Sequence, residues 1–214
     1  MKTSYEKTYE KSRILIMGVN QVEEIKQRIA PVYNEERLAK GNELLQLAKQ
    51  SMIAQDKEMI EASMATKAYH EVDEQLHSVL VKIRKAIRYF FKNDEIVLAN
   101  MHINDPIPTD YNGWKALCEQ VMNGIILFPI VQQKLELIGI NQEMVRQCKA
   151  DLDKLDQLKS DAARESGEAQ VASEAKHEAF DNLNAYCIDL RECLDLFFED
   201  SERQQLEKVG IIVQ

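Results

Sequence analysis

The chain has 214 residues, of which 27 are Lys or Arg and 36 are Asp or Glu, so its formal net charge is −9 and its pI is about 5.1. So acidic a chain lacks the dense positive footprint that is needed when the main task is binding a nucleic-acid backbone. Seven Gly and four Pro are few for this length, which favours long helices over a turn-rich β fold.

The first predicted helix covers residues 4–29. Apolar residues recur through it at helical spacing, namely Ile14, Ile16, Met17, Val22, Ile25 and Ile29. Pro31 marks its end, because proline disfavours helical geometry in the residue that precedes it. Asn34 then suits an N-cap, since its side chain can accept a hydrogen bond from a free amide at the start of the next helix.

The next segment, residues 34–100, contains one Gly and no Pro, and its apolar residues follow the 3-4 spacing of helices packed at shallow angles. It fits either one very long helix or a helical hairpin. The corresponding later segment includes residues 159–170, which carry no large apolar side chain. That gap favours a hairpin, with the equivalent turn at 52–63. The expected core comprises Leu76, Ile83, Ile87, Phe90, Leu183, Leu190, Leu194 and Phe197.

The clearest break in the chain lies at residues 101–113, where Pro106 and Pro108 stand among several turn-forming residues. A further helix is expected over 114–138. Pro129 should break or kink that helix, because its nitrogen has no hydrogen to donate to the helix ladder.

The last long predicted segment begins at Asn141, which suits an N-cap in the same way as Asn34. It repeats the pattern of the earlier long segment and runs to about residue 206. Residues 210–213 are small or apolar, and we expect them to pack back on the helices.

An internal repeat relates the two halves of the chain. With an ungapped shift of 107 residues, residues 34–95 align with 141–202 and 16 of the 62 positions are identical. The clearest matches are Ala68, His70, Glu71, Leu76, Arg84, Phe90 and Phe91 with Ala175, His177, Glu178, Leu183, Arg191, Phe197 and Phe198. Such repeats are usually supersecondary units that stack on each other. The sequence therefore predicts an all-α, elongated helical bundle, built by tandem duplication of a leading helix plus a long antiparallel hairpin, with repeats at 1–105 and 106–214.

The four cysteines, Cys118, Cys148, Cys187 and Cys193, all lie in the second repeat and have no counterparts in the first. No CxxC motif or zinc-type Cys/His spacing occurs, so we expect free thiols in a reducing compartment. Residues 1–9 do not resemble a signal peptide, and no apolar stretch is long enough to cross a bilayer. These features predict a cytoplasmic protein.

A charge inversion between the repeats is the main candidate for an interaction site. Four basic residues share one predicted helix face, namely Lys82, Lys85, Arg88 and Lys92. Their counterparts in the second repeat are all acidic, namely Asp189, Glu192, Asp195 and Glu199. Opposed faces of opposite charge set partner choice and register, so we expect the two faces to meet within one chain or between chains. A solvated surface whose charges drifted is the competing interpretation.

Two ExxH pairs, Glu74 with His77 and Glu174 with His177, have the spacing that di-iron helical bundles use. They are not equivalent under the repeat and lie off the apolar stripe, so we expect solvent-exposed histidines without metal. The apolar run Ile125–Val131 resembles a segment that a pore-forming helical protein conceals, although a run this short usually belongs to a core helix.

The expected function is therefore non-enzymatic. No nucleophile with a base, phosphate-binding Gly-rich loop or catalytic carboxylate pair is apparent, and we expect no cofactor. We predict a structural or adaptor protein that binds a protein partner or another copy of itself through its charged helix faces. Nucleic acid and membranes are not the expected partners. A membrane-active helical protein and a metal-binding bundle oxidoreductase are the two alternatives.

Overall fold

The structure is a computed structural model that describes residues 3–199 and 202–211, and these residues form helices and loops with no strand. The elements are α1 (Ser4–Gln21), α2 (Glu23–Ile29), α3 (Glu35–Phe90), α4 (Glu95–Asn100), α5 (Tyr111–Leu127), α6 (Pro129–Glu136), α7 (Gln142–Phe197) and the 3-10 helix η1 (Arg203–Val209). The predicted all-α fold is confirmed.

The chain folds into two compact units, and each unit takes part of its chain from both halves of the sequence. Unit 1 comprises Met1–Glu61 and Ser166–Gln214, and unit 2 comprises Ala62–Glu165. The long helices α3 and α7 therefore each contribute one segment to each unit. The predicted repeats at 1–105 and 106–214 remain a prediction about the sequence.

The ends of several helices follow from local side-chain chemistry. Thr3 forms a capping box with Glu6, in which the Thr3 hydroxyl accepts from the Glu6 amide and the Glu6 carboxylate accepts from the Thr3 amide. The Asn34 side chain accepts from the Arg37 amide at 3.0 Å. The two predicted asparagine caps are confirmed, since Asn141 likewise accepts from the amide three residues later at 2.8 Å.

Two of the predicted helices are interrupted. The expected break at Pro129 is confirmed, because α5 ends at Leu127 and Pro129 is the first residue of α6. The helix predicted over 4–29 is divided at Val22 into α1 and α2, with Val22 in an extended conformation. This second break was not expected from the sequence, where no proline marks it.

The predicted hairpin within each long segment is wrong, since α3 and α7 are each one continuous helix of 56 residues. Residues 159–170 lack an apolar stripe, but seven of the twelve are Ala, Glu, Arg or Gln, which are strong helix formers. The absence of large apolar residues therefore leaves this part of α7 without an apolar face, but it does not end the helix. The bounds of α3 and α7 differ by the same 107 residues as the sequence repeat, and the duplication stays a prediction.

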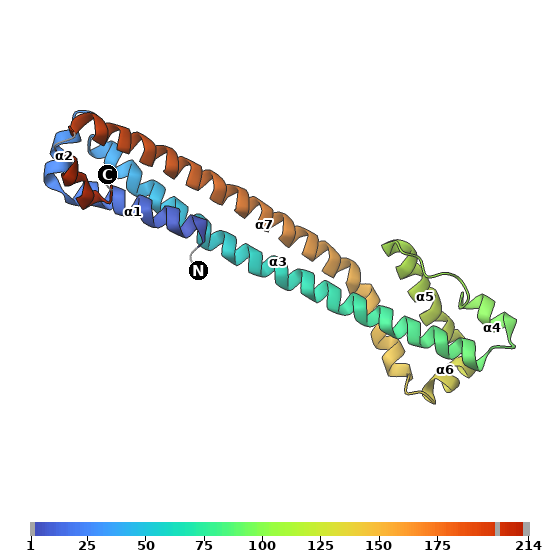
Figure 1. Cartoon of the computed structure of the whole chain (residues 1–214). Helices are drawn as coiled ribbons and strands as arrows, with labels where there is room; N and C mark the ends of the chain where they lie inside the picture. The colour runs from blue at the N-terminus through green and yellow to red at the C-terminus, as the bar shows by residue number, and fades with distance from the viewer. Residues whose placement is uncertain (1–2, 200–201, 212–214) are drawn as a thin grey trace. The chain divides into compact units, whose positions relative to one another are not determined.

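In unit 1, α1, α2 and η1 lie beside the N-terminal part of α3 and the C-terminal part of α7 (Figure 1). The two long helices run antiparallel there, because Arg37 contacts Asp189 while Gln55 contacts Lys176. The core is mainly aliphatic, and its most enclosed residues are Ile16, Val19, Ile25, Ile29, Leu183, Leu190, Leu194, Leu206 and Val209. Ile211 packs against this core, whereas residues 212 and 213 of the predicted terminal segment lie outside the described residues.

In unit 2, α4, α5 and α6 lie with the C-terminal part of α3 and the N-terminal part of α7 (Figure 1). Its core gathers residues from all five elements, including Leu80, Ile83, Ile87, Met101, Trp114, Val121, Ile125, Val131, Leu135 and Leu155. Trp114 is the only tryptophan of the chain and is 2% exposed, so it reports on the packing of this unit.

Six of the eight predicted core residues are buried, and the two phenylalanines are the exceptions. Phe90 and Phe197 are only partly buried, while the next residues, Phe91 and Phe198, are 8% and 2% exposed. The 3-4 spacing of apolar residues permits either Phe90 or Phe91 to be the next buried residue after Ile87. In the structure the buried residue is Phe91, four positions after Ile87. Both buried phenylalanines directly follow the last residue of a long helix.

Candidate functional site

The predicted basic face lies in unit 2. Lys82, Lys85, Arg88 and Lys92 are all exposed, the first three on α3 and Lys92 just beyond its end. Among the described residues, none of the three lysines forms an ion pair within 4.0 Å, and Arg88 donates to a main-chain carbonyl. The three lysines of this face therefore present positive charge with no carboxylate partner within 4.0 Å in the described part of the chain.

The predicted acidic face lies in unit 1, and its four residues are exposed. Two of them are already engaged there. Asp189 accepts from the Arg37 guanidinium at 2.7 Å and from the Tyr33 hydroxyl, and Asp195 pairs with Arg203 at 3.2 Å. The other two, Glu192 and Glu199, form no ion pair with any described residue. The meeting of the basic and acidic faces remains a prediction.

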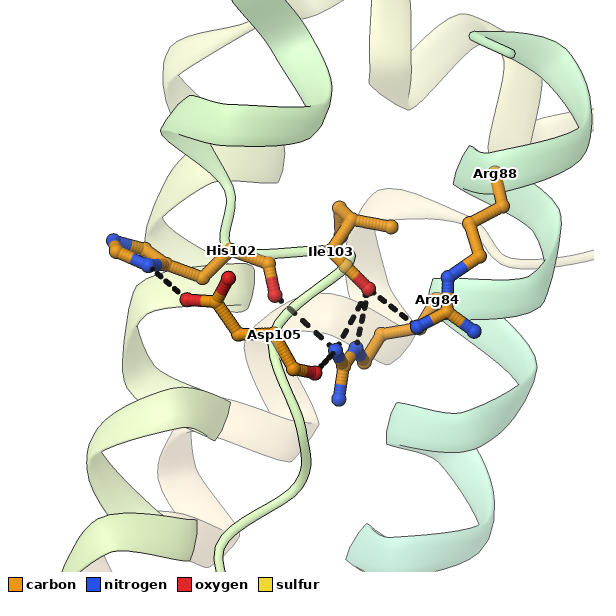
Figure 2. A network of polar contacts seen from close by, with 5 residues as sticks. All are labelled: Arg84, Arg88, His102, Ile103 and Asp105. Atoms are coloured by element: carbon orange, nitrogen blue, oxygen red, sulfur yellow. Dashed lines mark hydrogen bonds and ion pairs between the residues drawn. The ribbon is translucent and has the colours of Figure 1, made fainter. Parts of the chain in front are cut away.

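Arg84 is the unexpected feature of the basic region, because it is only 2% exposed although it lies one residue from Lys85. Figure 2 shows its guanidinium directed at the loop that follows α4. Its Nε and Nη2 donate to the carbonyl of Ile103 at 3.2 and 2.7 Å, and Nη2 also donates to the carbonyls of His102, at 3.2 Å, and Asp105. Arg88, one turn later, donates to the same Ile103 carbonyl at 2.5 Å.

The conformation of the chain at the C-terminus of α4 makes the carbonyls of His102 and Ile103 available to accept hydrogen bonds from Arg84. The His102 amide donates to Ala99 and the Ile103 amide donates to Leu98, which together form the Schellman pattern of a helix C-terminus. His102 takes the left-handed conformation with φ of 54°, at a position where glycine is usual. The carbonyls of residues 102 and 103 thus lie beyond the helix and accept from α3.

The charge of Arg84 has no carboxylate hydrogen-bond partner. The carboxylate of Asp105, whose main-chain carbonyl accepts from Arg84, lies 2.7 Å from Nδ1 of His102 instead. Burial and then the nearby charge of Arg88 lower the pKa of Arg84 from its usual value. Its Nη1 is buried and has no hydrogen-bond partner among the described residues. Two guanidinium groups are therefore held together by neutral acceptors.

A surface pocket of about 250 Å³ opens beside this network. It is lined by Val81, Arg84, Lys85, Arg88, Asn104, Asp105, Pro106 and Ile107. Two members of the predicted basic face thus line a concave surface, whereas Lys82 and Lys92 do not.

Sequence reasoning identified Lys85 and Arg88 but missed Arg84. One signal was available, because Arg84 and its counterpart Arg191 are identical in the repeat while the four basic residues around Arg84 are replaced by acids. The signal could not distinguish the two copies. Arg191 is exposed, so the burial of Arg84 depends on the loop at 102–105 and not on the helix that carries it.

The histidine of each predicted ExxH pair contacts an aromatic residue. His77 is stacked on Trp114 with ring centroids 4.1 Å apart, and half of its side chain is exposed. His177 is exposed and lies 2.5 Å from the hydroxyl of Tyr5. Within the described residues, neither pair belongs to a group of three ligand-type side chains close enough to hold one ion.

The four cysteines are buried and none is in a disulfide. Burial raises the pKa of the Cys118 thiol to about 12, so this group stays protonated near neutral pH.

The apolar run Ile125–Val131 contains both buried and exposed residues. Ile125 and Val131 are fully buried, whereas three residues between them are substantially exposed, namely Ile126, Leu127 and Ile130. In the described part of the chain, no helix is both long and apolar enough to cross a membrane.

Comparison with known proteins gives no relative from which a function could be inferred. No family model, curated protein or solved structure matches the chain.

Proposed function

We propose that this protein is a non-enzymatic structural or adaptor protein whose basic face, formed by Lys82, Lys85, Arg88 and Lys92, binds an acidic protein surface. The observation that carries the proposal is the exposure of three lysines of unit 2, two in the last turns of α3 and one just beyond its end, without an ion pair among the described residues. Clustered charge of one sign is a means of choosing a partner, because it attracts the opposite sign and repels its own.

The magnitude of each contact argues for a collective effect. An exposed ion pair contributes only about 0–1 kcal/mol, so no single lysine of this face would hold a partner. Several such pairs together steer association, raise the rate of encounter and fix the register of two helices. Binding of this kind is weakened by salt, since the Debye length falls from about 30 Å at 0.01 M to about 3 Å at 1 M.

A second copy of the chain supplies a matching surface. Glu192 and Glu199 are exposed and form no ion pair with described residues, so they are available to another molecule. Asp189 and Asp195 are held by Arg37 and Arg203 and would contribute less. Self-association through opposite faces follows from this charge complementarity, and the free buried thiols suit a reducing, cytoplasmic location.

The oligomeric state tests the proposal directly. Light-scattering mass should increase with protein concentration in about 10 mM salt and fall towards that of one chain in about 1 M salt. The variant Lys82→Glu/Lys92→Glu should remain a single chain in both, whereas Lys7→Glu/Lys11→Glu on α1 should behave like the wild type as a control for net charge. A wild type that stays monomeric in low salt would contradict self-association.

A membrane-active role is a second candidate, because Ile126, Leu127 and Ile130 are 50%, 74% and 49% exposed in the middle of an apolar run. Apolar side chains of this size at the surface favour contact with a lipid interface or another protein. Release of a dye from anionic lipid vesicles would favour this role over the adaptor role. Intact vesicles at saturating protein would remove it.

A further inference from the structure

The pocket beside Arg84 contains more positive than negative charge. Arg84, Lys85 and Arg88 line it with three positive charges, and Asp105 contributes one negative charge, which leaves two positive charges unbalanced. Even that carboxylate is directed at His102, 2.7 Å away. The pocket therefore favours an anion, and specifically one that carries about two negative charges.

The donors that line the pocket differ in how much capacity they have left. Arg88 donates through Nη2 to the Ile103 carbonyl, and no hydrogen bond is formed by its other guanidinium nitrogens among the described residues. Lys85 is exposed and forms no ion pair with the described part of the chain. Arg84 is fixed by three carbonyls and still has one unsatisfied nitrogen, so it contributes charge from a rigid position.

We propose that this pocket binds a phosphate group, with Arg88 and Lys85 donating to its oxygens and Arg84 supplying a fixed positive charge behind them. A phosphate monoester carries about −1.5 to −2 charges at neutral pH, which matches the excess of the pocket, whereas a carboxylate carries one. Guanidinium groups also match the oxygen geometry of phosphate.

The size of the pocket limits the ligand. Its volume of about 250 Å³ lies just below the range of about 300–1,000 Å³ that is typical of sites for whole small molecules. It accommodates a phosphate group and a few further atoms. The proposal does not depend on an acidic protein partner, because it involves the concave surface and not the exposed face as a whole.

The test is calorimetric titration of the full chain with inorganic phosphate. We expect saturable binding of one phosphate per chain, weakened about tenfold or more in Arg88→Gln, since a charge-assisted hydrogen bond is lost. Lys92→Gln is the matched control, because Lys92 belongs to the same basic face but does not line the pocket, and it should bind phosphate like the wild type. Unchanged circular dichroism in both variants shows that the fold is retained.

Further ligands identify the chemistry and its source. Tighter binding of glycerol 3-phosphate than of inorganic phosphate would support a site for phosphate monoesters, and the reverse order would support a site for the free ion. Acetate binding as tightly as phosphate, non-saturable phosphate binding, or equal losses in Arg88→Gln and Lys92→Gln would overturn the proposal. The variant Lys82→Glu/Lys92→Glu, which tests the protein-binding role, should keep its phosphate site, so the two proposals can fail separately.

Discussion

Replacing Arg84 by Met should destabilise unit 2 far more than the same change at Arg191 destabilises unit 1. Met keeps much of the side-chain volume but removes the donors to residues 102, 103 and 105. The Ile103 carbonyl retains Arg88, so two carbonyls lose this partner. A buried polar group without a partner costs about 1–3 kcal/mol, so two fully buried carbonyls would cost about 2–6 kcal/mol. His102 is only half-buried and Asp105 is exposed, so we expect the lower part of this range, about 2–4 kcal/mol.

The gain from no longer burying a charge beside Arg88 offsets part of this loss, so the net destabilisation should be about 1–3 kcal/mol. Urea denaturation followed by the fluorescence of Trp114 measures it, because the only tryptophan lies in the core of the same unit. The control Arg191→Met changes an exposed side chain and should cost less than about 0.5 kcal/mol. Equal effects of the two substitutions would refute the structural role assigned to Arg84.

Three further predictions concern packing. Phe198→Ala should lower the free energy of unfolding by about 3–5 kcal/mol in chemical denaturation and Phe197→Ala by much less, because only Phe198 is fully buried. Similar losses in the two variants would favour the sequence-based expectation that Phe197 is the core residue. Gly41→Ala should lower the melting temperature despite the better helix propensity of alanine, since the added Cβ would lie 2.6 Å from the ring of Tyr186. An unchanged or higher melting temperature would contradict this close approach. The Cys118 thiol, whose pKa burial raises to about 12, should resist iodoacetamide at about pH 8 until the protein is unfolded; mass spectrometry that finds rapid alkylation of the native protein would disagree.

Local chemistry was predictable from the sequence wherever one residue decides the outcome. Asn34 and Asn141 cap helices because a short polar side chain reaches a free amide, and Pro129 begins a helix because it cannot continue one. The break at Val22 was not predictable in this way, since no residue in the segment forbids helical geometry. The hairpin was predicted wrongly because a loss of amphipathic pattern was interpreted as a loss of helix.

The candidate site was predictable only in part. The charge inversion identified Lys85 and Arg88, but the pocket that they line depends on a loop that returns to α3 after α4. Nothing in the local sequence of Arg84 distinguishes it from Arg191, because the two are equivalent in the repeat. Tertiary contacts with residues 102–105 make one arginine buried and leave the other exposed.

The central claim, that the basic face of this protein binds an acidic surface of another copy, is tested most directly by mixing two variants. Lys82→Glu/Lys92→Glu reverses two of the four charges of the basic face and leaves the acidic face intact, and Glu192→Lys/Glu199→Lys reverses two of the four charges of the acidic face and leaves the basic face intact. Each alone should sediment as a single chain in low salt, and an equimolar mixture should form a heterodimer that dissociates in high salt. A mixture that sediments as two unassociated chains, with a wild type that does associate, would contradict docking through these faces.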